Sequence, residues 1–284
     1  MKKTLSLVLL SFFSLSFLQA QELENTLLWK ISGKNLKQAS YLYGTLHATC
    51  DASLSDHVKL ALDETSLLVL ELDMDDPTMN SKMMSNIAMK DNQNIKDLLS
   101  EEDYNSLDTF MQAQFSAPLS ALETFKPFFL SSMLITKFLD CPVQSYEAEL
   151  IKVAKAQKEE VMGLETVEEQ MNVFDEIPYK DQLNNLMTSI KDDLNEDKAK
   201  FKKMLAYYNA GNLNGIKKIT EEDEAFTKHK DLLLTNRNEN WISKIENFSE
   251  EQPTFFGVGA AHLIGDKGVI KLLRAQGYTV TAIK

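Results

Sequence analysis

Two short stretches of the chain share one pattern, an apolar run that stops at a glycine followed three residues later by histidine. The first reads SYLYGTLH and ends at His47, and the second reads TFFGVGAAH and ends at His262. Each is followed by a helical pattern and then by another short apolar run. Apolar runs of this length are typical of buried strands. We therefore interpret the pattern as a β-turn-α-β unit that is used twice.

This duplication predicts an α/β fold with a central mixed sheet built from two β-turn-α-β (GxxH) units. Residues 75–252 separate the units and read as helical apart from one short strand, so we expect a large helical insert there. In open α/β sheets, ligands bind at the carboxyl ends of the strands. If the two units pack together, His47 and His262 face each other at that edge. The alternative is two loop histidines that only bind backbone groups, because GxxH by itself can arise by chance.

Acidic residues follow two of the expected strands. Glu71 and Asp73 end the apolar run that begins at Leu67, and alternation along a strand points both side chains the same way. Glu165 ends another short apolar run, just before a helix start marked by Thr166. These carboxylates are candidates to join the histidines. The alternative is that they are solvated acids where a strand meets a loop.

Arginine is rare in this chain. Arg237 and Arg274 are the two arginines among 30 basic residues. Where lysine serves nearly everywhere, a retained arginine suggests a task that needs a planar guanidinium. Arg237 could bind a carboxylate of the site or a substrate oxygen, or it could form an ordinary ion pair on a helix surface.

The N-terminal segment reads as a signal peptide. Residues 1–20 combine a lysine start, a serine-interrupted apolar core and a small residue at position 20, and the core is too short for a membrane span. We expect export to the periplasm or beyond, no stable membrane anchor, and a single domain over residues 21–284. The net charge of −12 gives little attraction for nucleic acid. After export, Cys50 and Cys141 could form a disulfide or stay as free buried thiols.

The chain resembles the TraB/GumN family, which is related to the Tiki metalloproteases and more remotely to erythromycin-esterase and ChaN-like proteins. The segments that carry the resemblance are YLYGTLHATC, VLELD, GLETVEEQ, LLTNRNENW and FFGVGAAHLIGDKGVIKLLRAQGYTV. The resemblance implies that His47, His262 and a strand-end glutamate form the site. Glu71 and Glu165 compete for that glutamate, and we prefer Glu71 because its strand follows the first GxxH unit. By a looser analogy with the esterases, the arginine of the site is Arg237.

Two imidazoles and one carboxylate can hold a divalent metal while leaving positions open for a substrate or water. Such a metal polarises a carbonyl group and lowers the pKa of bound water. Glu165 or Asp73 could then act as the general base, and Arg237 could stabilise an oxyanion. The Tiki resemblance implies manganese or cobalt rather than zinc.

These residues predict an exported metal-dependent hydrolase, most simply a peptidase with a peptide or protein substrate. One alternative is a non-catalytic protein that sequesters a peptide or haem, since TraB-type members limit peptide pheromone signalling and ChaN-like relatives bind haem. The other alternative is an esterase. The sequence contains no HExxH, no GxSxG and no glycine-rich phosphate loop, so it gives no basis for a zincin, a serine hydrolase or a nucleotide-binding protein.

Overall fold

The computed structural model describes residues 23–284, and the expected signal peptide lies outside them. Within that range the chain forms one six-stranded sheet in the order β4-β3-β5-β2-β1-β6. The strands are β1 (Leu28–Ser32), β2 (Ser40–Thr45), β3 (Leu67–Leu72), β4 (Glu160–Glu165), β5 (Thr254–Gly259) and β6 (Thr279–Ile283). β4, β3, β5 and β2 are parallel, while β1 runs antiparallel to both of its neighbours. The predicted mixed α/β sheet is confirmed.

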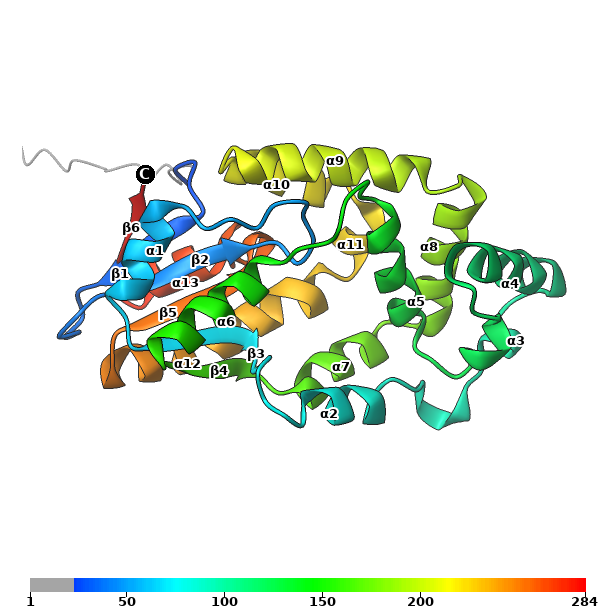
Figure 1. Cartoon of the computed structure of the whole chain (residues 1–284), viewed down its shortest axis with the longest axis horizontal. Coiled ribbons are helices and arrows are strands. Elements are labelled where there is room, and N and C mark those ends of the chain that lie inside the picture. The colour runs from blue at the N-terminus through cyan, green and yellow to red at the C-terminus, as the bar shows by residue number, and fades with distance from the viewer. Residues whose placement is uncertain (1–22) are drawn as a thin grey trace, which may run out of the picture.

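The two GxxH units interlock in this sheet. The first unit passes from β2 through α1 (Asp56–Asp63) to β3 and skips over β5. The second passes from β5 through η5 (Ala260–Leu263) and α13 (Val269–Ala275) to β6, and skips over β2 and β1. The two crossovers run in opposite directions across the sheet. Because such crossovers share a right-handed sense, their helices lie on opposite faces, as α1 and α13 do in Figure 1.

The other helices come between β3 and β5 in the sequence, and while some of them lie against the sheet, others extend away from it (Figure 1). Between β3 and β4 they are α2 (Met79–Ser85), η1 (Lys90–Asn92), α3 (Ile95–Leu98), α4 (Glu101–Phe115), η2 (Leu119–Ala121), α5 (Pro127–Leu134), η3 (Ile135–Lys137) and α6 (Tyr146–Gln157). Between β4 and β5 they are α7 (Val167–Glu176), α8 (Tyr179–Lys191), α9 (Asn195–Asn209), α10 (Leu213–Glu221), α11 (Glu224–Lys228), the π-helical turn η4 (Asp231–Thr235) and α12 (Asn236–Glu251). None of these described helices is long and apolar enough to cross a membrane.

Local sequence signals explain several helix starts. Ser55 caps α1 by accepting a hydrogen bond from the backbone N–H of Val58. Thr166 and Glu169 form the reciprocal capping box that the sequence predicts for α7. Pro127 occupies the first turn of α5, where a missing N–H is harmless. α13 begins only at Val269, because the backbone first turns through residues 260–268.

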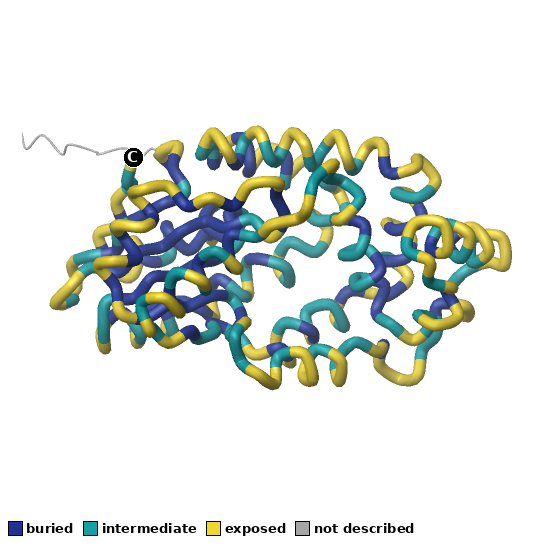
Figure 2. The backbone as a smooth tube through the Cα atoms, viewed as in Figure 1, coloured by how far each residue is buried: buried dark blue, intermediate teal, exposed yellow. Residues whose placement is uncertain are grey.

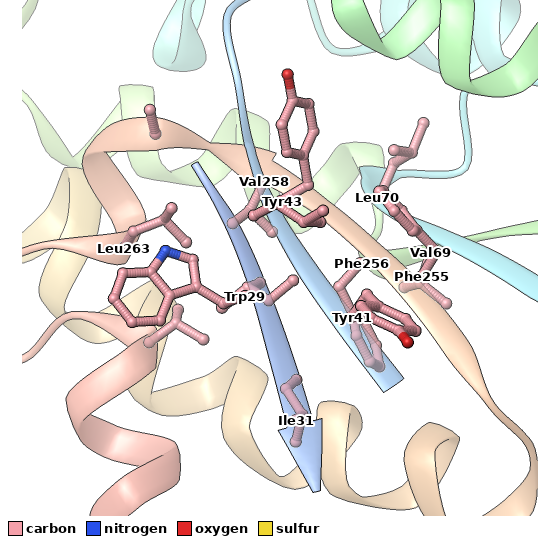
Figure 3. Packing of buried hydrophobic residues seen from close by; sticks show 14 of the residues in the cluster. Trp29, Ile31, Tyr41, Tyr43, Val69, Leu70, Phe255, Phe256, Val258 and Leu263 are labelled. Carbon is pink, nitrogen blue, oxygen red and sulfur yellow. The ribbon is translucent and has the colours of Figure 1, made fainter. Parts of the chain in front are cut away.

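The apolar core is divided between the sheet and the helical part. The sheet cluster packs residues of β1, β2, β3 and β5 against each other and against the covering helices (Figure 3). A second cluster joins α4, α5 and α8 at the far end of the chain's helical part. Figure 2 shows the buried positions concentrated in these two regions. The helices between β3 and β5 also contribute to the sheet cluster, since α6 packs on β3 and β4 while α12 packs on β4 and β5.

Both GxxH glycines stand where a side chain would collide with the other unit. A Cβ added at Gly44 would lie 2.8 Å from the Leu263 side chain and 3.1 Å from the Ala260 backbone. A Cβ added at Gly259 would lie 3.2 Å from a carboxylate oxygen of Glu71. The glycines therefore allow the second turn to pack closely on β2 and on the end of β3.

Candidate active site

Three neighbouring strands bring the predicted site residues to one edge of the sheet. His47 lies two residues beyond β2, Glu71 is the next-to-last residue of β3, and His262 lies in η5 directly after β5. β3, β5 and β2 are adjacent and parallel, so their carboxyl ends meet at the same edge. The predicted convergence of these strand ends is confirmed. The assignment of roles to the individual residues stays a prediction.

Arg237, in the first turn of α12, connects two carboxylates. Its Nη2 donates to Glu71 Oε2 at 2.7 Å and to Glu165 Oε2 at 2.8 Å, and its Nε donates to Glu165 Oε1 at 2.9 Å. All three side chains are 7–12% exposed. A planar guanidinium suits this geometry, because it can bind one carboxylate through two parallel bonds and still reach a second. The alternative of a surface ion pair for Arg237 is wrong.

Other groups complete the surroundings of this cluster. The indole Nε1 of Trp241 donates to Glu165 Oε1 at 2.9 Å, and the ring also lies under the guanidinium of Arg237, 4.9 Å from its centroid. The backbone N–H of Gly259 donates to Glu71 Oε1 at 2.8 Å. Gln170 of α7 reaches Glu71 Oε2 at 3.3 Å. Both carboxylates are thus held by donors from several elements.

His262 is buried, and its tautomer follows from its neighbour Asn238. The Asn238 amide nitrogen donates to the backbone carbonyls of His262 (3.3 Å) and Lys267 (2.8 Å), so the amide oxygen must face the ring. That oxygen lies 2.6 Å from Nδ1, which therefore carries the proton. Nε2 is left as an acceptor, and Arg237 Nη1 lies 3.2 Å from it.

Burial and nearby charges keep the ring of His262 neutral and the carboxylate of Glu71 ionised. Burial lowers the pKa of His262 to about 3, and the positive charge of Arg237 acts in the same direction against the opposing effect of Glu71. Burial alone would raise the pKa of Glu71, but nearby positive charges and the Gly259 N–H outweigh it and lower that pKa to about 2. Since His262 is neutral above about pH 3, Arg237 is the main partner that keeps Glu71 ionised at neutral pH.

His47 has a different environment. Its Nδ1 lies 2.8 Å from Oε1 of Glu147, whose side chain is 5% exposed, while the His47 side chain itself is 68% exposed. Partial burial opposes charge on the ring, but the close contact with Glu147 and its negative charge outweigh this effect and raise the pKa of His47 to about 9. The charges of Glu71 and Arg237 have smaller and opposite effects on that pKa.

Three residues of this site were not predicted from the sequence, and Asp73, an alternative to Glu165 as the general base, lies outside the cluster. Glu147, Asn238 and Trp241 were not singled out, although Trp241 stands one helical turn after Arg237 and shares its face. Asp73 lines a neighbouring cavity and has no direct contact with the histidines. Arg237 binds both Glu71 and Glu165, so the structure places the two competing glutamates in one cluster, and the preference for Glu71 as the metal ligand stays a prediction.

The imidazole and carboxylate side chains of the site are of the types that bind divalent metals. In this structure, however, Arg237 contacts Nε2 of His262 and Oε2 of Glu71. Each imidazole has Nδ1 engaged by an oxygen, as metal-binding histidines usually do, which leaves Nε2 as the donor atom. Nε2 of His262 and Oε1 of Glu71 are 3.7 Å apart. Within residues 23–284 no three His, Cys, Asp or Glu side chains are already arranged around a common metal position.

The model of the TraB/PrgY/gumN family matches residues 27–282, which is nearly all of the described chain. The chain belongs to the TraB/PrgY/gumN family. Both GxxH histidines, both glutamates and Arg237 lie within the matched range.

Curated relatives of the family are similar over most of this chain. Metalloprotease TIKI2 of Danio rerio is 22% identical over 90% of this chain and 60% of its own length. Metalloprotease TIKI1 is 23% identical in Danio rerio and 21% in Homo sapiens, over 90% of this chain and 63% and 61% of those proteins. The chain thus spans about three-fifths of the length of these relatives. No solved structure matches it significantly.

Proposed function

We propose that this protein is an exported metal-dependent hydrolase that cleaves peptide bonds, with His47, Glu71 and His262 as the metal ligands. The observation that carries this proposal is the convergence of two imidazoles, each with Nδ1 already engaged, and a buried ionised carboxylate at one edge of the sheet. Similarity to the proteins named Metalloprotease TIKI1 and TIKI2 supports the same reaction class.

The proposed cofactor is a divalent ion, manganese or cobalt rather than zinc. When bound, such an ion polarises a substrate carbonyl and lowers the pKa of a water molecule. Glu71 and His262 are held in place for this task by the Gly259 N–H and by Asn238, respectively. Rigid support of this kind is what metal ligands require.

Arg237 is the proposed oxyanion-stabilising residue. Every N–H of its guanidinium is engaged, by Glu71, Glu165, the Leu233 carbonyl or His262. If the Nε2 lone pair of His262 held a metal ion, the N–H of Arg237 that contacts it would lose this acceptor. The freed N–H can then donate to a substrate oxygen as negative charge develops on it.

Glu165 is better suited to position Arg237 than to act as the general base. Its two oxygens accept from Arg237 and Trp241, and the side chain is 7% exposed. A carboxylate so engaged holds the guanidinium in orientation and has little capacity to take a proton from water. The catalytic group of the proposed site is therefore Arg237, supported by Glu165.

An open cavity of about 550 Å³ adjoins the cluster at Glu165 and is the space that we propose for part of a peptide substrate. It is lined by the ends of β3 and β4 together with α2, α7 and α12. This volume is in the range of small-ligand sites. Met79 and Phe248 supply apolar surface to it, while Asp73 and Lys244 supply charge.

The disulfide supports the proposed export. Cys50 and Cys141 are bonded in the structure, with Cα atoms 5.7 Å apart. Such bonds persist in oxidising compartments such as the periplasm and the extracellular space.

To test this proposal, chelator-treated protein is supplied with manganese, cobalt or zinc and incubated with panels of peptides and esters. We expect peptide cleavage that requires the added ion and is abolished in His47→Ala and His262→Ala, together with loss of ion binding. His57→Ala is the matched control, because His57 is exposed on α1 outside the site. Parent-like ion binding in both site variants would exclude the proposed ligand set.

One observation favours the alternative of a non-catalytic binding protein. Arg237 already compensates Glu71 and Glu165 and contacts His262, so the cluster is electrostatically satisfied by protein groups alone. In that case the protein would bind peptides with equal affinity with and without added metal and would leave them intact.

A further inference from the structure

Glu147 is a buried carboxylate on α6 that neither a motif nor a strand-end position indicates. It stands at the second position of the helix, where the helix dipole favours a negative charge. Neither of its oxygens has a hydrogen-bond partner of regular geometry within residues 23–284. Its Oε1 lies 2.8 Å from Nδ1 of His47, and the side chain of Thr45 and the backbone N–H of Glu147 also favour its charged form. The pKa of Glu147 is lowered, because the bond to His47 and its charge outweigh the effect of burial.

One disulfide and two backbone hydrogen bonds join the chain segments that carry His47 and Glu147. Cys50 and Cys141 form the disulfide, and Thr49 and Gln144 exchange two backbone hydrogen bonds of 2.9 and 2.8 Å. These links lie two or three residues after His47 and three residues or more before Glu147. They fix the loop that carries the imidazole against the first turn of α6. Such a construction holds two side chains in a defined geometry although they are 100 residues apart in sequence.

We propose that Glu147 is the positioning residue of His47: it binds Nδ1–H and thereby presents Nε2 to the site formed by Glu71, Arg237 and His262. Asn238 does the same for His262, so the two GxxH histidines have equivalent support from different elements, one anionic and one neutral. The inference rests on the proposed function only in that His47 belongs to the site. The position of the ring and its bond to Glu147 can be measured without metal or turnover.

The experiment observes the imidazole N–H of His47 in metal-free protein by ¹H–¹⁵N NMR, assigned by its absence in His47→Ala. A bond to a buried carboxylate slows exchange of this proton with water, so we expect a resolved signal in the parent. It should vanish in Glu147→Leu and move upfield in Glu147→Gln, whose amide oxygen is a weaker acceptor. Glu149→Gln is the matched control, since Glu149 lies two residues further along α6 and pairs with Lys152.

Metal affinity gives an independent measurement. Titration with Mn²⁺ should show binding about 10–100-fold weaker in Glu147→Leu and partly restored in Glu147→Gln. An N–H signal that stays unchanged in Glu147→Leu would overturn the inference, as would parent-like Mn²⁺ affinity in that variant. If Glu147→Leu does not fold, Glu147→Gln decides, because an unshifted signal there excludes the bond. If the parent binds no Mn²⁺, the proposed function fails while the NMR signal still tests Glu147.

Discussion

Arg237 and Glu165 are joined by two parallel hydrogen bonds, from Nε to Oε1 at 2.9 Å and from Nη2 to Oε2 at 2.8 Å. The pair links α12 to the end of β4, so it fastens the last helix before the second GxxH unit to the sheet. Both side chains are largely buried, and Trp241 covers the pair on one side. The site thus depends on an ion pair that is also part of the fold.

We expect Glu165→Leu to destabilise the protein by about 3–5 kcal/mol, because it leaves part of a buried guanidinium charge without its partner. Urea unfolding followed by circular dichroism measures the change. The matched control is Asp266→Leu, which removes the exposed partner of Lys271 and should leave the urea midpoint close to that of the parent, because water screens exposed pairs. A similar loss in both variants would mean that the Arg237–Glu165 pair contributes no more than a surface pair.

Sequence patterns predicted the parts of this site that depend on local structure. His47 and His262 could be placed because each ends a short apolar run, and a strand end is readable from periodicity. Glu147 could not be placed, since its contact with His47 arises from the packing of α6 and from a disulfide that the sequence left open. Asn238 follows Arg237 directly, but nothing local shows that its amide faces a ring 24 residues later. Likewise, nothing local shows that His229, which stands between Lys228 and Lys230, is only 12% exposed at its side chain and lies 3.5 Å from Asp181.

The opposite pKa shifts of the two histidines predict a stability maximum near pH 6.5. His47 has a raised pKa of about 9, so its contribution is complete below pH 6.5 and is lost as the pH rises towards 9. His262 has a lowered pKa of about 3, so its contribution is lost as the pH falls from 6.5 towards 3. Glu71 has a lowered pKa of about 2, so its contribution to stability is also lost as the pH falls from about 4.5 towards 2. Urea midpoints measured from pH 4 to pH 10 should therefore fall on both sides of pH 6.5.

Glu147→Gln should flatten the alkaline side of that profile while leaving the acid side steep. The reason is that a neutral amide no longer favours the charged form of His47. The effect should be modest, because the ring is 68% exposed and water screens the pair. An alkaline slope as steep as in the parent would show that another group titrates there.

Removing the support of His262 should weaken the site more than it weakens the fold. Asn238→Ala leaves the buried Nδ1–H of His262 without its acceptor, which we expect to destabilise the protein by about 1–3 kcal/mol. Metal affinity should fall about 10–100-fold, since the ring is free to change tautomer. Asn240→Ala on the exposed side of α12 is the control, and it should resemble the parent in both the urea midpoint and Mn²⁺ titration.

The disulfide should matter to His47 as well as to overall stability. Cys50 and Cys141 enclose a long loop, with 91 residues of sequence separation, so the bond restricts the unfolded chain strongly. Replacing both cysteines by serine should destabilise the protein by about 2–5 kcal/mol in urea unfolding. Because the same bond aligns the His47 loop with α6, the imidazole N–H signal of His47 should also broaden under conditions where the variant is still folded. A reduced urea midpoint with an unchanged His47 signal would show that the backbone hydrogen bonds between Thr49 and Gln144 hold the pair without the disulfide.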